Sequence, residues 1–108
     1  MKKVKRNKHY LYVLCHAGPE VRKAIVRHSN RDLIVTIAEC IYNILRGNPT
    51  LSGVQKSRLR PYSSVCRKIV SPTTSAAQKK RLVLQKGGSL LPLILKPIFA
   101  AVPWLLKG

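Results

Sequence analysis

The balance of charge is the feature that most restricts how this chain can fold. Its 108 residues include 21 lysines and arginines but only three acidic residues, a formal net charge of +18. Repulsion among so many cations opposes compaction, so a stable fold must keep them at the surface and bury enough apolar residues to compensate. Hydrophobic residues make up 45% of the chain, too many for a disordered polybasic tail. We therefore expect one small folded domain with a basic surface.

Apolar residues recur at helical spacing in the first half of the chain. The longest stripe consists of Leu33, Ile34, Ile37, Ile41, Ile44 and Leu45. Asn30 suits the N-cap of this helix, Asp32 suits its first turn, and Gly47 suits its C-terminal end. We expect this helix to form the centre of the core.

Shorter helices are expected before it. Tyr10, Leu11, Val13 and Leu14 are at helical spacing. Gly18 breaks the chain, and Pro19 suits the first position of a second short helix. The expected inner face of that second helix consists of Val21, Ala24, Ile25 and His28.

The middle of the chain is basic and contains clear helix boundaries. Ser52 is a suitable cap for a short basic helix, which Pro61 interrupts. The segment from Ser71 to Ser75 predicts a break and a cap before a helix over residues 76–86, which Gly87 and Gly88 end. Because runs of alternating polar and apolar residues are lacking, the sequence predicts an all-α fold, a small bundle of short helices.

The C-terminal segment is apolar and interrupted by prolines. We divide the chain into a basic helical nucleic-acid-binding domain, residues 1–88, and an apolar tail, residues 89–108. Prolines at positions 92, 97 and 103 argue against a stable helix across a bilayer. The tail either docks on the helical core or makes a membrane or assembly contact. The second interpretation predicts an exposed surface formed by Leu90, Leu91, Leu93, Ile94, Leu95, Ile98, Phe99, Trp104 and Leu105.

Residues for catalysis or metal binding are scarce. The acidic residues, Glu20, Asp32 and Glu39, are too few for several carboxylate-based sites, and no known catalytic motif occurs, so we expect no enzymatic activity. The three cysteines are widely spaced and form no zinc-ligand pattern with histidines, so we expect reduced thiols and neither metal nor cofactor. The basic N-terminal run leads into only a short apolar stretch, so we expect an intracellular protein that is not secreted.

The cations occur in clusters with few acids to pair with them. Such surfaces bind phosphate backbones through counterion release, with little preference for sequence, and phosphate contacts are common to DNA and RNA. Residues 19–46 could contain a helix-turn-helix motif. Asn30 and Arg31 do not identify a recognition helix there, however, because both residues are common at helix starts. The candidate nucleic-acid-binding residues are Lys2, Lys3, Lys5, Arg6, Lys8, Lys56, Arg58, Arg60, Arg67, Lys68, Lys79, Lys80, Arg81 and Lys86.

Three stretches of the chain resemble proteins of virus-like elements. A Lys-rich N-terminus with a Tyr-Leu helix, the sequence ILRGNPTLSGVQKSRLR and the sequence KKRLVLQKGG are together similar to small basic proteins of adintoviruses and Polinton (Maverick) elements. The last quarter of the chain, a basic run, Gly87-Gly88 and a Leu-Pro-Leu-rich stretch, resembles the precursor of adenovirus core protein X (mu).

This resemblance implies a virion core protein that condenses packaged double-stranded DNA, found in the virion and the host nucleus. It also implies cleavage by a viral cysteine protease at Gly87, Gly88 and Ser89, with the cut after Gly88. Gln85 departs from the adenovirus protease pattern, which has a large aliphatic residue there, and Leu84 is one place too early.

The sequence is also compatible with two classes of function other than DNA condensation. In one, the basic part holds anionic lipid and the apolar tail inserts into or disrupts a bilayer. In the other, a small helical adaptor uses its tail to bind a capsid or host protein. Capsid or other virion proteins are also possible partners of a DNA-condensing protein, and the apolar tail makes self-association plausible.

Overall fold

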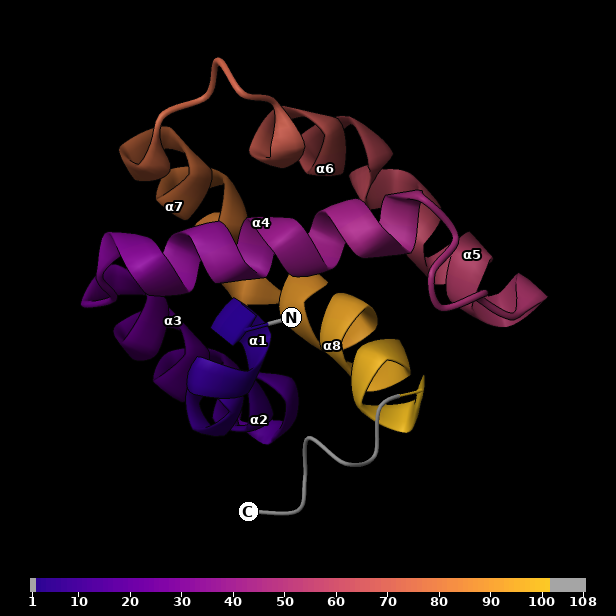
Figure 1. Cartoon of the computed structure of the whole chain (residues 1–108), viewed down its shortest axis with the longest axis horizontal. Coiled ribbons are helices and arrows are strands. Elements are labelled where there is room, and N and C mark those ends of the chain that lie inside the picture. Colours follow the sequence, from indigo (N-terminus) through magenta and orange to yellow (C-terminus); the bar gives the residue numbers. More distant parts are fainter. Residues whose placement is uncertain (1, 102–108) are drawn as a thin grey trace.

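The computed structural model describes residues 2–101, except for the side chain of Lys2 and the solvent exposure of Gly87. This part of the chain is helical and without strands. The predicted all-α fold is therefore confirmed. The elements, drawn in Figure 1, are α1 (Lys2–Arg6), α2 (Lys8–His16), α3 (Pro19–Arg27), α4 (Arg31–Leu45), α5 (Gly53–Leu59), the 3₁₀ helix η1 (Arg60–Tyr62), α6 (Ser63–Val70), α7 (Ala76–Leu84), the 3₁₀ helix η2 (Gln85–Gly88) and α8 (Leu90–Ala101).

Helix α4 is the centre of the molecule, as the sequence predicts. It crosses the middle of the view, with α6 and α7 on one side and α1, α2 and α8 on the other (Figure 1). The predicted stripe is buried except for Leu45, which is 41% exposed at the end of the helix. The Asn30 side chain accepts a hydrogen bond from the Leu33 backbone N–H at 3.0 Å, and Gly47 has a φ of +78° after the last turn. Because α4 is packed on several sides, it cannot enter a DNA groove as a recognition helix.

The N-terminal basic run is part of the folded bundle. Although KKVKR contains four cations, it forms α1, which packs against α4. Val4 is 1% exposed, and the apolar face continues through Leu11 and Leu14 of α2. Asn7, between the two helices, is also buried. One helical face contains Val4, Asn7, Leu11 and Leu14, which recur at helical spacing. The lysines around them make this apolar pattern hard to recognise in the sequence.

Helix α3 has the predicted start but a different inner face. Pro19 occupies its first turn as expected. The expected inner face is wrong, because Val21, Ala24 and His28 are exposed and only Ile25 is partly buried. Val26 is the buried residue instead. Arg22, one turn earlier, is half-buried, so an arginine stem forms part of the inner face that this helix presents to the core.

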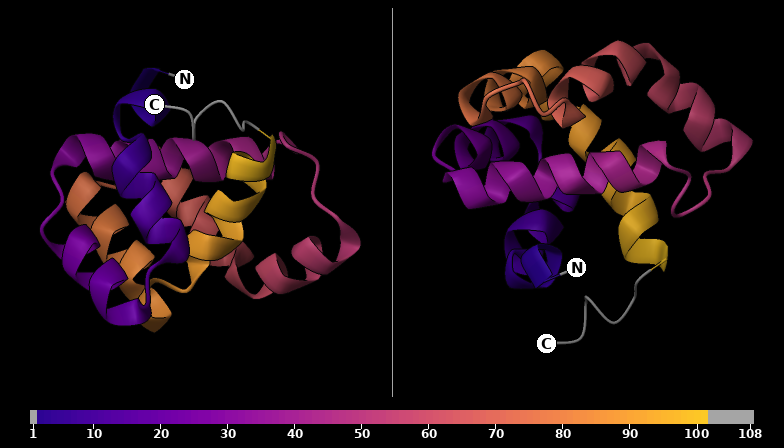
Figure 2. Two further views of the ribbon diagram at one scale, coloured as in Figure 1. Left: turned by 90° about the horizontal axis from the view of Figure 1, so that it is seen from below. Right: turned by 45° about the horizontal axis from the view of Figure 1, so that its top comes forward.

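The helix starts in the basic middle are those that the sequence predicts, but the expected end of the helix over residues 76–86 is wrong, because α7 ends at Leu84 and Gly87 and Gly88 belong to η2. Ser52 and Ser75 each form a complete capping box, with Gln55 and Gln78 respectively, at the starts of α5 and α7. Pro61 lies in η1, where the chain turns from α5 into α6. Helices α5, α6 and α7 together form an arc over α4 (Figure 2, right).

The first part of the apolar tail, α8, lies inside the bundle. It packs against α2, α4 and α5. The expectation of a separate apolar surface is therefore wrong for the described residues, and the alternative, docking on the core, is what the structure shows. Trp104 and Leu105 lie outside the described residues. The other seven side chains of that expected surface are Leu90, Leu91, Ile94, Leu95, Ile98 and Phe99, all less than 8% exposed, and Leu93, partly buried.

The boundary expected after residue 88 does not separate two packing units. Residues from α2, α4, α6, α7 and α8 contribute to one continuous hydrophobic core. The radius of gyration is 12.6 Å, close to the value of about 13 Å for a single domain of 100 residues. No helix in residues 2–101 is long and apolar enough to cross a membrane.

Candidate nucleic-acid interface

The arc of α5, η1, α6 and α7 presents most of the predicted cations of the middle segment to solvent. Ser52 and Ser75 fix the starts of α5 and α7 through their capping boxes. Repulsion among these cations is small only because they are solvated, and a polyanion would reduce it further. The exposed members are Lys56, Arg58, Arg60, Arg67, Lys68 and Arg81.

Two of these exposed cations lie close together on neighbouring helices. Lys68 of α6 and Arg81 of α7 line the same surface hollow of about 380 Å³, together with Gln78 and Gln85. Each of the four side chains can donate hydrogen bonds to phosphate oxygens. This hollow is therefore the place where the structure brings predicted cations from α6 and α7 together.

Lys86 lies at the end of the arc beside an aromatic ring. Its Nζ is 5.2 Å from the centroid of the Tyr62 ring, a cation–π geometry, and its backbone has a φ of +54°. The Tyr62 hydroxyl in turn is 2.6 Å from the Ser89 Oγ. Tyr62 thereby links η1 to the start of α8 and holds the exposed Lys86 beside η1.

Two predicted site lysines on α7 are bound to backbone carbonyls. Lys79 donates from Nζ to the carbonyls of Ile69 and of Ser71, the latter at 2.9 Å, at the end of α6. Burial lowers the pKa of the Lys79 amino group. Lys80 donates to the Ser29 carbonyl at 2.8 Å, just after α3. Both amino groups act as C-terminal caps, which gives them a structural role that the sequence pattern did not reveal.

Arg6, a third predicted site residue, is engaged in an ion pair. Its Nη2 and Nε donate to the two carboxylate oxygens of Asp32 at 2.6 and 3.2 Å, and Asn7 Nδ2 donates to the same carboxylate at 3.0 Å. The hydrogen bonds from Arg6 and then from Asn7 lower the pKa of Asp32. Asn7 also donates to Thr36 Oγ1 at 3.1 Å, so this polar network fastens α1 to α4.

The remaining N-terminal cations lie on a different part of the surface from α5 and α6. Lys3 and Lys5 are exposed and Lys8 is half-buried, whereas the side chain of Lys2 lies outside the described part. Lys3 and Lys79 line the same groove of about 260 Å³, together with Glu39 and other residues of α4. The N-terminal cluster therefore approaches α7 at a groove that also contains an acidic residue.

Arg46 is an exposed cation that the sequence reasoning did not include. Its guanidinium carbon is 5.4 Å from the centroid of the Tyr42 ring, and Tyr42 is 47% exposed. The sequence signal for this contact is that the tyrosine and the arginine are four residues apart at the end of a long helix, which places them on the same face. Arg46 lies near Lys56 and Arg60 around a surface pocket.

The predicted cleavage point is folded into the bundle. Gly88 is buried with a φ of +72°, and the atoms nearest to its missing Cβ position belong to Leu91 and Arg22. Ser89 is half-buried and bonded to Tyr62. Residues 85–88 form a 3₁₀ helix rather than an extended segment, so the implied cleavage point lies at a compact turn between α7 and α8.

The three cysteines are free and buried. Burial raises the pKa of Cys40 to about 12 and that of Cys66 to about 11, and it also raises the pKa of Cys15. Such thiols are weak nucleophiles at neutral pH. Within residues 2–101, no three His, Cys, Asp or Glu side chains lie close enough together to hold a metal ion.

Comparison of the chain with protein-family models, with curated proteins and with solved structures gave no match. The resemblance to proteins of Polinton-type elements therefore stays a prediction. The basis for a functional proposal is the geometry of the cations.

Proposed function

We propose that this protein is a non-enzymatic nucleic-acid-binding protein that neutralises and condenses double-stranded DNA without sequence preference, as a virion core protein does. The observation that carries the proposal is the arc of exposed cations on α5, η1, α6 and α7. In the described part of the chain, the salt bridges join Arg6 to Asp32 and Lys23 to Glu20, so the cations of the arc have no carboxylate partner.

The arrangement favours non-specific phosphate contacts over reading of bases. The cations are distributed along an arc of short helices, and α4, the longest helix in residues 2–101, lies at the centre of the bundle (Figure 2). Contacts to phosphate position a protein on DNA but carry little sequence information. We accordingly propose the virion and host nucleus as its location, with DNA and other virion proteins as partners.

The structure does not support the feature on which the membrane alternative was based. It required an exposed apolar tail, whereas the described part of that tail forms α8 in the core. We therefore do not propose it as a second function.

The test is binding of the full chain to random-sequence duplex DNA across a salt series. The full chain is needed because α8 supplies part of the core. If about six phosphates are neutralised, the logarithm of the association constant should fall with the logarithm of salt concentration with a slope near −5. A competitor DNA of different sequence should displace the probe equally well. A shallow slope, or strong preference for one sequence, would contradict the proposal.

A pair of charge-matched variants locates the interface. Arg58→Glu, Arg67→Glu and Arg81→Glu together remove three exposed cations of the arc, and the slope should become shallower by about 3 units, with affinity roughly a hundredfold lower at 0.15 M salt.

The matched control changes three exposed cations outside the arc, Arg27→Glu, Arg31→Glu and Lys96→Glu, by the same net charge. The slope of this control should change by less than about 1 unit. Equal losses in the two variants would mean that DNA does not prefer the arc.

A further inference from the structure

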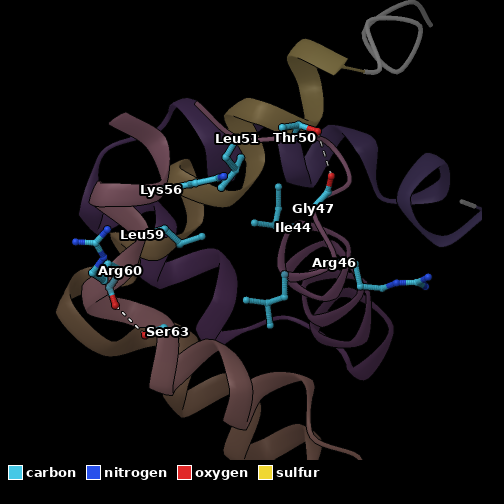
Figure 3. A pocket seen from close by; sticks show the side chains of 10 residues that line it. Ile44, Arg46, Gly47, Thr50, Leu51, Lys56, Leu59, Arg60 and Ser63 are labelled. Carbon is cyan, nitrogen blue, oxygen red and sulfur yellow. Dashed lines mark hydrogen bonds between the residues drawn. The ribbon is translucent and has the colours of Figure 1, made fainter. Parts of the chain in front are cut away.

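A pocket at the C-terminal end of α4 combines an apolar floor with a basic rim (Figure 3). It has a volume of about 500 Å³ and lies between the end of α4, the following loop, α5 and the start of α6. Its floor is formed by Ile44, Leu45, Leu51 and Leu59. Leu45 remains 41% exposed there, although the rest of the stripe on α4 is buried. The size is sufficient for one or two large apolar side chains.

Three cations surround this floor, and no acid lines it. The Lys56 side chain extends across the pocket so that its amino group lies beside Leu51, whereas Arg46 and Arg60 reach outward on opposite sides (Figure 3). Glu20 and Asp32 form ion pairs elsewhere, and Glu39 lines the groove beside Lys3. The basic rim is therefore uncompensated within the described part of the chain.

The two properties together define the chemistry of an occupant. The phosphates of DNA can satisfy the rim but leave the leucine floor exposed to water, because a phosphate backbone has no apolar group to insert there. A second copy of this chain is unsuitable, since its charge of +18 would be repelled by the rim. An occupant that matches both the basic rim and the apolar floor must carry carboxylates around a large apolar side chain.

We propose that this pocket binds an acidic peptide segment of another protein, with a leucine or phenylalanine of that segment on the floor and its carboxylates against Lys56, Arg46 and Arg60. The site shares Lys56 and Arg60 with the proposed DNA interface, but peptide binding differs from DNA binding because it depends on the apolar floor. It would allow the protein to contact an acidic protein partner while the cations of α6 and α7 remain available for DNA.

The proposal is tested with two labelled synthetic peptides and the full chain. One peptide is acidic with central leucines, and the other has the same charge but alanines in place of the leucines. At about 0.15 M salt, fluorescence anisotropy should show binding of the leucine peptide that is at least tenfold tighter, as expected when large apolar side chains are buried. Equal affinity for both peptides would overturn the proposal, because binding would then be general attraction to a basic surface.

A variant of the floor separates this site from the DNA interface. Leu45→Gln keeps the length of the side chain and alters an exposed position, so the fold should persist. It should weaken the leucine peptide about tenfold and leave DNA affinity unchanged. The matched control is Val21→Gln, which changes an apolar side chain with similar exposure, 49%, on α3. If both variants weaken the peptide equally, or neither does, the pocket is not its site.

A measurement on the unaltered protein provides an independent check. Methyl NMR signals of Ile44, Leu45, Leu51 and Leu59 should shift on addition of the leucine peptide, while those of Val21 on α3 stay in place. Shifts confined to residues outside the pocket would overturn the proposal even if the peptide binds tightly.

Discussion

Helices α7 and α8 both hold the bundle together, but by different physical means. α8 buries apolar side chains such as Leu91 and Ile94 against α2, α4 and α5. α7 buries Val83, and it also extends Lys79 and Lys80 to the carbonyls at the ends of α6 and α3. Lysines in one basic run can therefore belong to the framework of the fold, so a count of cations overstates the charge available to a partner.

The largest effect is expected from a truncation in α8. Ile94→Ala removes a side chain that is 0% exposed, and it should lower the free energy of unfolding by about 2–5 kcal/mol through lost burial and a residual cavity. Lys96→Ala, at an exposed position of the same helix, should change it by less than about 0.5 kcal/mol. Urea denaturation followed by circular dichroism measures both. If the free energy of unfolding of Ile94→Ala equals that of the parent, α8 is not docked on the core in solution, and the interpretation of residues 89–108 as a separate apolar tail would be favoured.

A smaller effect is expected from a lysine of α7. Lys79→Met keeps most of the side-chain length but removes the donor to Ser71 and Ile69, so stability should fall by about 1 kcal/mol. Lys68→Met, at an exposed position on α6, should leave stability nearly unchanged but weaken DNA binding more than Lys79→Met does. The reverse order in the two assays would show that Lys79 is a phosphate ligand and not a cap.

The smallest effect is expected from the ion pair that joins α1 to α4. Because the pKa of Asp32 is lowered in the folded state, the pair contributes stability above the unfolded pKa of about 3.9, and this contribution is lost as pH falls through the folded pKa. Asp32→Asn should therefore lower the thermal midpoint slightly at neutral pH and converge with the parent in acid. Glu20→Gln, in an exposed pair, is the control. A constant difference across the pH range would contradict this account.

Local chemistry made much of the fold predictable. Asn30, Ser52 and Ser75 cap the helices that they were expected to start, because a cap depends on residues within one turn. The stripe on α4 was also predictable, since fifteen residues are long enough to define one apolar face. Only Leu45, at the last position, departs from it.

The rest depended on contacts between distant segments. In α3, nine residues allow more than one inner face, and the stem of Arg22 occupies part of the one that forms. The apolar residues of α8 predict that this segment is buried, but they do not say against which surface. A helix of the chain's own core and a tail that contacts a membrane or partner therefore look alike in sequence. For the candidate site, the positions of cations were readable, but Lys79, Lys80 and Arg6 find their acceptors only in the folded chain.

The buried turn at Gly88 has a consequence for comparisons among relatives. With a φ of +72°, this position costs any other residue except asparagine or aspartate about 1–2 kcal/mol, and a Cβ there would contact Leu91 and Arg22. Selection for a stable bundle is therefore sufficient to retain glycine at position 88 through evolution. An invariant glycine there in an alignment would be evidence for the shape of the backbone, and would need protease data before it indicated processing.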